Sequence, residues 1–181
     1  MRLAWGLFLR CATFLILLGL ALSVGADITS SREVGYRLRL LQIHTGKRLE
    51  VVYRYGDRYD PKALTQLDQY LRDRRTGAVH EYDPRVFDLL HELTTALGRP
   101  DAEIDVLCGY RTPWTNEYLR KHGHAVALHS LHMKAMAIDI RVPGVSTSQL
   151  RDTALALHRG GVGYYASSDF VHVDVGRVRR W

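Results

Sequence analysis

Two short segments carry side chains that are able to bind a metal ion together. In SLHMKAMAID, His132 is followed seven residues later by Asp139, which enters an apolar run. In FVHVDV, strand alternation places His172 and Asp174 on one face and the valines on the other. Imidazole and carboxylate groups are ligands that zinc accepts. The pattern therefore indicates a zinc site, with ordinary hydrogen-bonded polar residues as the alternative.

The remaining histidines and the second cysteine are interpreted more simply. Four histidines fall in an expected hairpin or on expected helix surfaces and are assigned as solvated or capping residues: His44, His80, His91 and His158. Three more lie in the aperiodic segment HGHAVALH, which is expected to form a surface loop beside a site: His122, His124 and His129. Cys108 ends the apolar run IDVLC, so we interpret it as a small core residue rather than a thiol nucleophile.

The elements that must position these residues follow from periodicity and from cap signals. Residues 36–44 and 47–55 alternate apolar and polar side chains around Thr45-Gly46, which predicts a β-hairpin with a two-residue turn. Further strands are predicted over 104–108, 138–142, 161–165 and 170–175, and helices over 60–71, 83–97, 112–121 and 147–159. This order predicts an α+β fold, with one antiparallel sheet and flanking helices.

Length and composition describe one globular domain. The chain has 181 residues, of which 46% are hydrophobic and 24% charged, so collagen-like, low-complexity and wholly disordered classes are excluded. The net charge of +6 suits nucleic acid and anionic cell-envelope polymers equally, and does not choose between them.

The N-terminus indicates export. Arg2 and Arg10 precede the apolar run CATFLILLGLALSV, and Val24-Gly25-Ala26 has the form of a cleavage site. We predict a signal peptide over residues 1–26, a flexible lead-in over 27–35 and the functional domain over 36–181. An uncleaved membrane anchor is the alternative, and either arrangement exports the domain.

The chain resembles the MepK-type murein endopeptidases, which are zinc peptidases related to the D-alanyl-D-alanine carboxypeptidases and share the hedgehog-like fold. The resemblance spans the predicted mature chain and includes SLHMKAMAID, GYRTPWTNEYLR and FVHVD. The family motif Ser-x-His-x-x-Gly-x-Ala-x-Asp matches at Ser130, His132, Ala137 and Asp139. Ala135 replaces the motif glycine, and a positive φ there would strain the backbone by about 1 kcal/mol.

The resemblance implies a role for each site residue. His132, Asp139 and His172 would bind Zn²⁺ and leave a fourth position for water. Arg111 would bind substrate and stabilise the oxyanion. Asp174 would be the general base or would orient a ligand histidine, and Asp169 is the alternative base because it precedes His172 by three residues, as the catalytic acid does in related carboxypeptidases.

The implied function is hydrolysis of peptide cross-links in peptidoglycan by a periplasmic zinc peptidase. The expected partner is the peptide stem of peptidoglycan, with no nucleic acid, no membrane contact unless the signal segment is uncleaved, and a monomeric state. The alternative is a non-catalytic, zinc-containing domain on the same fold that binds peptidoglycan.

Overall fold

The computed structural model describes residues 34–122 and 126–181, and the expected signal peptide, most of the lead-in and His124 lie outside them. The described residues belong to one compact unit. The strands are β1 (Gly35–Gln42), β2 (Lys47–Tyr55), β3 (Arg58–Tyr59), β4 (Glu103–Cys108), β5 (Ala137–Arg141), β6 (Gly161–Tyr165), β7 (Phe170–Asp174) and β8 (Arg179–Arg180). The helices are α1 (Pro61–Tyr70), α2 (Arg85–Ala96), α3 (Pro113–Lys121) and α4 (Thr147–Leu157), with 3-10 turns at Leu131–Lys134 and Ala166–Ser168.

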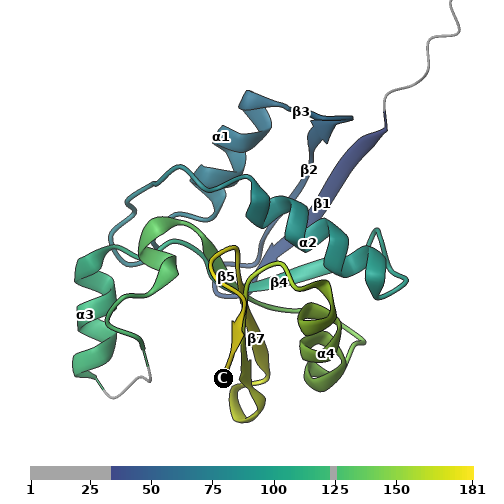
Figure 1. Cartoon of the computed structure of the whole chain (residues 1–181). Coiled ribbons are helices and arrows are strands. Elements are labelled where there is room, and N and C mark those ends of the chain that lie inside the picture. Colours follow the sequence, from purple (N-terminus) through teal and green to yellow (C-terminus); the bar gives the residue numbers. More distant parts are fainter. Residues whose placement is uncertain (1–33, 123–125) are drawn as a thin grey trace, which may run out of the picture. The chain divides into compact units, whose positions relative to one another are not determined.

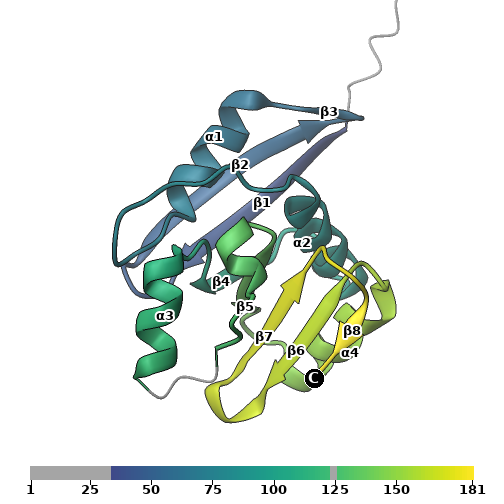
Figure 2. The same ribbon diagram turned by 60° about the vertical axis from the view of Figure 1, so that its left-hand side comes forward.

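The strands form one sheet in the order β3-β2-β1-β4-β5-β7-β6-β8 (Figures 1 and 2). The predicted α+β class is confirmed, but the sheet is mixed rather than antiparallel, because β1 pairs with β4 and β6 pairs with β8 in parallel. The chain leaves the sheet through α1 and α2 between β3 and β4, and a crossover of this length permits parallel pairing. Strands β3 and β8 have two residues each, which is too short for an alternation pattern.

Local signals place several of the element boundaries. Asp60 caps α1 by accepting a hydrogen bond from the Lys62 amide, and Thr112 caps α3 through the Thr115 amide. The predicted hairpin is present, but its connection spans residues 43–46 instead of two residues. Gly35 belongs to β1, so the predicted lead-in ends one residue too late.

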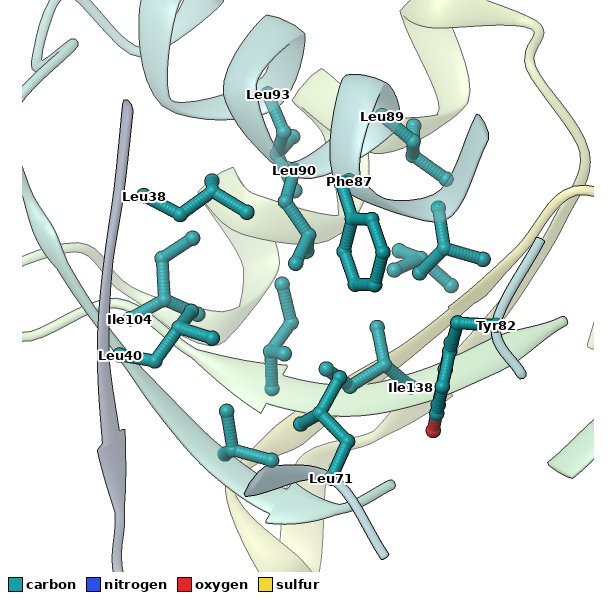
Figure 3. Close-up of a cluster of buried hydrophobic side chains, with 14 of the residues drawn as sticks. Leu38, Leu40, Leu71, Tyr82, Phe87, Leu89, Leu90, Leu93, Ile104 and Ile138 are labelled. Atoms are coloured by element: carbon teal, nitrogen blue, oxygen red, sulfur yellow. The ribbon is translucent and has the colours of Figure 1, made fainter. Parts of the chain in front are cut away.

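The core lies between α2 and one face of the sheet. Phe87 and Leu90 of α2 are fully buried and point toward the sheet, where Leu40 of β1, Ile104 of β4 and Ile138 of β5 lie (Figure 3). The same face of β5 and β7 contributes buried residues at alternate positions: Ile138, Ile140, Val171 and Val173. The other face of these two strands is therefore available for polar side chains. Within the described residues no helix is long and apolar enough to cross a bilayer.

Candidate metal centre

Side chains from three separate elements converge on one point. The Nε2 of His132 lies 3.1 Å from Oδ1 of Asp139 and 3.1 Å from Nδ1 of His172, and the last two atoms are 2.9 Å apart. Ligand atoms around a tetrahedral zinc ion are separated by roughly 3.3 Å, given bond lengths of about 2.0–2.1 Å. One small cation is thus able to contact all three donors.

Strand pairing brings the two strand ligands together. Asp139 of β5 lies directly opposite His172 of β7 in the antiparallel register. Both side chains point away from the core face, since their neighbours Ile138 and Val171 are fully buried in the core. A slip of one residue in this register would turn one ligand into the core.

A 3-10 turn presents the third ligand. The Ser130 side chain caps the turn by accepting a hydrogen bond from the His132 amide. The turn ends at Ala135, whose φ of 49° and ψ of 41° are left-handed. The positive φ considered for this position is therefore present, at a residue that is not glycine.

Hydrogen bonds at the opposite ring nitrogens orient both imidazoles. Nδ1 of His132 donates to the Gly109 carbonyl at 2.7 Å, which leaves Nε2 with a lone pair for a metal. Nε2 of His172 lies 3.2 Å from Oδ2 of Asp174, so in this ring Nδ1 faces the other ligands. Such partners for the non-ligating nitrogen are typical of metal-binding histidines.

The electrostatics of the three donors suit a cation. Burial raises the pKa of Asp139, but His132 and His172 outweigh burial and hold that pKa well below its usual range. Burial lowers the pKa of His132. Burial also opposes the charged form of His172, but hydrogen bonds to Asp139 and Asp174 outweigh it and raise the pKa of that ring. A metal at this site therefore competes with a proton on Nδ1 of His172.

Cys108 lies beside these three residues and could form a second set of metal donors with two of them. Its Sγ, one donor atom of His132 and one donor atom of Asp139 all lie within 4.8 Å of one another. Burial and Asp139 raise the pKa of the thiol to about 12, so it is neutral at physiological pH. The donor atoms of His132, Asp139 and His172 lie closer together, within 3.1 Å of one another, than the set that includes Cys108. These distances favour the His-Asp-His set, which leaves one coordination position open.

Asp174 lies behind His172 and is fully buried. Its Oδ1 accepts hydrogen bonds from the amides of Gly161 and Gly176, each at 2.9 Å, and from Arg179 at 3.1 Å. Its Oδ2 accepts from Nε2 of His172 and from Arg179 Nη2 at 2.7 Å. Burial raises the pKa of Asp174, but these donors outweigh it and hold the pKa well below its usual range. The contacts favour the orienting role over the general-base role.

Asp169 faces a different direction. Its side chain is 63% exposed and pairs with Arg141, with Nη1 to Oδ2 at 3.3 Å, and with the Thr147 hydroxyl. Asp169 itself has a φ of 52°, which turns the chain just before β7. Its carboxylate does not line the cavity that contains the metal donors.

A cavity of about 560 Å³, called the metal cavity below, opens onto the three donors. Arg111 lines it and is only 8% exposed, and its Nε has no hydrogen-bond partner among the described residues. The Arg111 amide donates to the His132 carbonyl at 3.2 Å, which ties the two residues together. The guanidinium is thus a buried cation with one unused donor, Nε, beside the metal donors.

Two other residues of this cavity were not identified as site residues from sequence. Trp181 follows β8, and its ring centroid lies 5.2 Å from that of His172, while its Nε1 donates to the Tyr165 hydroxyl at 3.0 Å. His129 is exposed on the cavity wall. His122, from the same histidine-rich segment, stacks on Tyr118 instead. The segment was expected to lie beside a site, but its sequence does not show which of its histidines reaches the cavity. The fold shows that His129 does.

Comparisons with known proteins show what this chain is similar to. Residues 30–181 match the family model described as peptidoglycan L,D-endopeptidase MepK. A probable peptidoglycan L,D-endopeptidase MepK of Haemophilus influenzae is 42% identical over 144 residues, which cover 80% of this chain and 77% of the relative. The peptidoglycan L,D-endopeptidase MepK of Escherichia coli K12 is 37% identical over 144 residues, which cover 80% of this chain and 79% of the relative.

Proposed function

The chain belongs to the MepK family of peptidoglycan L,D-endopeptidases, and from this premise we propose that it hydrolyses the peptide cross-links of peptidoglycan as a zinc peptidase, at the bond between a diaminopimelate and the next residue. The observation that carries the proposal is the convergence of His132, Asp139 and His172 within 3.1 Å of one another at the floor of an open cavity. A structural zinc site would have four protein ligands and no such opening.

Each residue has a distinct task in this proposal. His132, Asp139 and His172 hold the ion, which when bound supplies an acidified water and polarises the scissile carbonyl. Asp174 positions His172 by fixing the orientation of its ring. Arg111 donates to the oxygen on which negative charge develops, because its guanidinium is desolvated and its Nε is an unused donor.

Hydrolysis also needs a side chain in the metal cavity that accepts a proton from the attacking water. Neither aspartate that the sequence suggested lines it, since Asp174 lies behind His172 and Asp169 pairs with Arg141. Among the described residues that line the cavity, His129 carries the one imidazole or carboxylate outside the donor set. We therefore assign proton transfer to His129, with Asp169 as the alternative.

Residues 1–26 are proposed to act as a cleaved signal peptide, with the domain acting as a monomer in the periplasm. The family's action on peptidoglycan agrees with this location. N-terminal sequencing of exported protein should return Asp27, whereas recovery of intact Met1 in membranes would favour the anchor.

Digestion of purified sacculi tests the proposed function. The zinc-loaded protein should release peptide fragments whose masses identify the cleaved bond, and His172→Ala should release none because its metal site has lost a ligand. His129→Gln and Asp169→Asn, assayed in parallel, assign the proton acceptor by which variant loses turnover while retaining zinc. A protein that holds zinc and binds sacculi but releases no fragments would instead be the non-catalytic binding domain.

A further inference from the structure

A second cavity adjoins the metal cavity on the other side of Arg111. This arginine cavity has a volume of about 230 Å³ and is lined by Arg72, Arg74, Arg75 and Arg111, among others. A third, outer cavity of about 170 Å³ shares Arg72 and Arg74 with it and adds Lys47. Arg111 is thus common to the metal and arginine cavities, and Arg72 and Arg74 are common to the arginine and outer cavities; the basic side chains along these cavities are called the basic track below.

The positive charge of the track is not neutralised within the described residues. No carboxylate of those residues forms an ion pair with Arg72, Arg74, Arg75 or Arg111. The one acidic residue that lines the arginine cavity, Asp73, is 1% exposed and already accepts hydrogen bonds from the amides of Arg75, Thr76 and Thr112. Burial without a partner disfavours a cation, so the nine-tenths buried Arg111 indicates an anionic ligand nearby.

The donors and acceptors of the track fit a peptide better than a simple anion. Gln42 lines both the arginine cavity and the outer cavity, and its Oε1 is a buried acceptor with no partner in the described parts of the chain. An acceptor beside arginines complements a ligand that offers an N–H group together with a carboxylate. Fully deprotonated anions such as chloride and sulfate offer no hydrogen-bond donor to this acceptor.

The arginine-bearing loop is held in place. Asp73 joins it to the start of α3 through the Thr112 amide at 2.7 Å and the Thr112 hydroxyl at 2.8 Å. The Arg75 guanidinium lies 4.5 Å from the centre of the Tyr118 ring. The basic wall is therefore positioned before any ligand arrives, which reduces the ordering cost of binding.

We propose that the arginine cavity and the outer cavity bind a carboxylate-bearing peptide stem on one side of the bond cleaved at the metal centre. The inference rests on the proposed function for the identity of this ligand. Cross-linked stems retain free carboxylates, and Arg111 lines both the catalytic and the binding cavity. Arg72, Arg74 and Arg75 then determine substrate affinity, whereas the metal donors determine turnover.

Paired charge-removing variants test the proposal in the zinc-loaded, full-length protein. Arg74→Gln/Arg75→Gln is compared with the matched control Lys62→Gln/Arg99→Gln, whose residues are exposed and line none of the three cavities. The probe is a dimeric stem peptide whose cross-link amide is replaced by a reduced, non-hydrolysable bond. We expect the arginine variant to raise its Kd about tenfold and the control variant to leave it within about twofold. Amidation of the probe's carboxylates should abolish the difference between the two variants.

Two results would overturn the inference: an unchanged Kd in the arginine variant, or an equal loss in the control, which would indicate non-specific attraction. Inorganic phosphate can also be added as a competitor of both probes. If it displaces the amidated probe as strongly as the free acid, the basic track is a binding site for a simple anion and not for the peptide stem. Failure of the proposed function would give a different result. Wild-type protein would then release no fragments from unmodified sacculi, although probe binding would still depend on Arg74 and Arg75.

Discussion

Asp174 and His172 lie two residues apart on one strand, and their side chains meet, with Oδ2 3.2 Å from Nε2. Residues i and i+2 of a strand share a face, so the spacing alone makes this contact possible. The surrounding amides of Gly161 and Gly176 and the Arg179 guanidinium keep the carboxylate ionised and fixed. The contact therefore orients the ring that presents Nδ1 to the other donors.

Replacement of Asp174 by asparagine should weaken metal binding. The Asp174 carboxylate accepts hydrogen bonds from Gly161, Gly176, Arg179 and His172. The NH2 group of asparagine cannot accept a hydrogen bond, so it would face at least one of these donors unfavourably. The ring of His172 would then lose its fixed orientation. We expect zinc affinity to fall about 10–100-fold in a competition titration with a chelator. Asp152→Asn, which alters an exposed aspartate paired with Arg151, is the control and should bind zinc as wild type. Unchanged affinity in Asp174→Asn would remove the positioning role.

Cys108→Ala separates the two overlapping donor sets. If His132, Asp139 and His172 hold the metal, the alanine variant should retain about one zinc ion per chain and near wild-type turnover. The thiol has a pKa of about 12, so wild-type protein should also resist alkylation at neutral pH. Loss of the metal in Cys108→Ala, measured by elemental analysis beside His172→Ala, would instead make Cys108 a ligand.

The metal donors were predictable because two kinds of signal coincide at them. Histidine and aspartate have ligand chemistry, and strand alternation separates His172 and Asp174 from the core valines. The direction of Asp169 was not predictable, because a φ of 52° at that residue turns its carboxylate toward Arg141. Trp181 was missed for a different reason: its position beside His172 depends on β8 pairing with β6, and a two-residue strand leaves no pattern in the sequence.

Ala135→Gly tests the backbone strain behind the metal-binding turn. Glycine relieves a left-handed conformation that costs about 1–2 kcal/mol, but it loses a buried methyl group worth about 0.8 kcal/mol and adds chain entropy worth about 0.5–1 kcal/mol. We therefore expect the free energy of unfolding to change by less than about 0.8 kcal/mol. Ala137→Gly, at an equally buried strand position, lacks the relief and should lose about 1.5 kcal/mol. Equal losses in denaturant titrations of the two variants would show that Ala135 is unstrained.

Asp73 should make stability depend on pH under acidic conditions. Burial raises its pKa, but hydrogen bonds from Thr115, Thr112 and Arg75 outweigh burial and lower it. A lowered folded-state pKa contributes stability above the unfolded value of about 3.9 and loses it as the pH falls through the folded value. Asp73→Asn should be less stable than wild type at pH 7, and the gap should close below about pH 4. Thermal melts across this range check it, with the exposed Asp101→Asn expected to show no such convergence.

Gly163 leaves the space in which Trp181 packs beside His172. A Cβ at this position would lie 2.7–2.8 Å from three atoms of the indole, closer than such atoms approach, and Gly163 is paired with His172 in the sheet. Because the indole is half exposed, with 50% of the residue accessible, it should move rather than the strands. We expect Gly163→Ala to raise KM for cross-linked peptides about tenfold through loss of this cavity wall, with zinc content unchanged. In a Trp181→Ala background the clash is gone, so Gly163→Ala should add less than about twofold. Additive effects in this double-mutant cycle would mean that Gly163 acts independently of the indole.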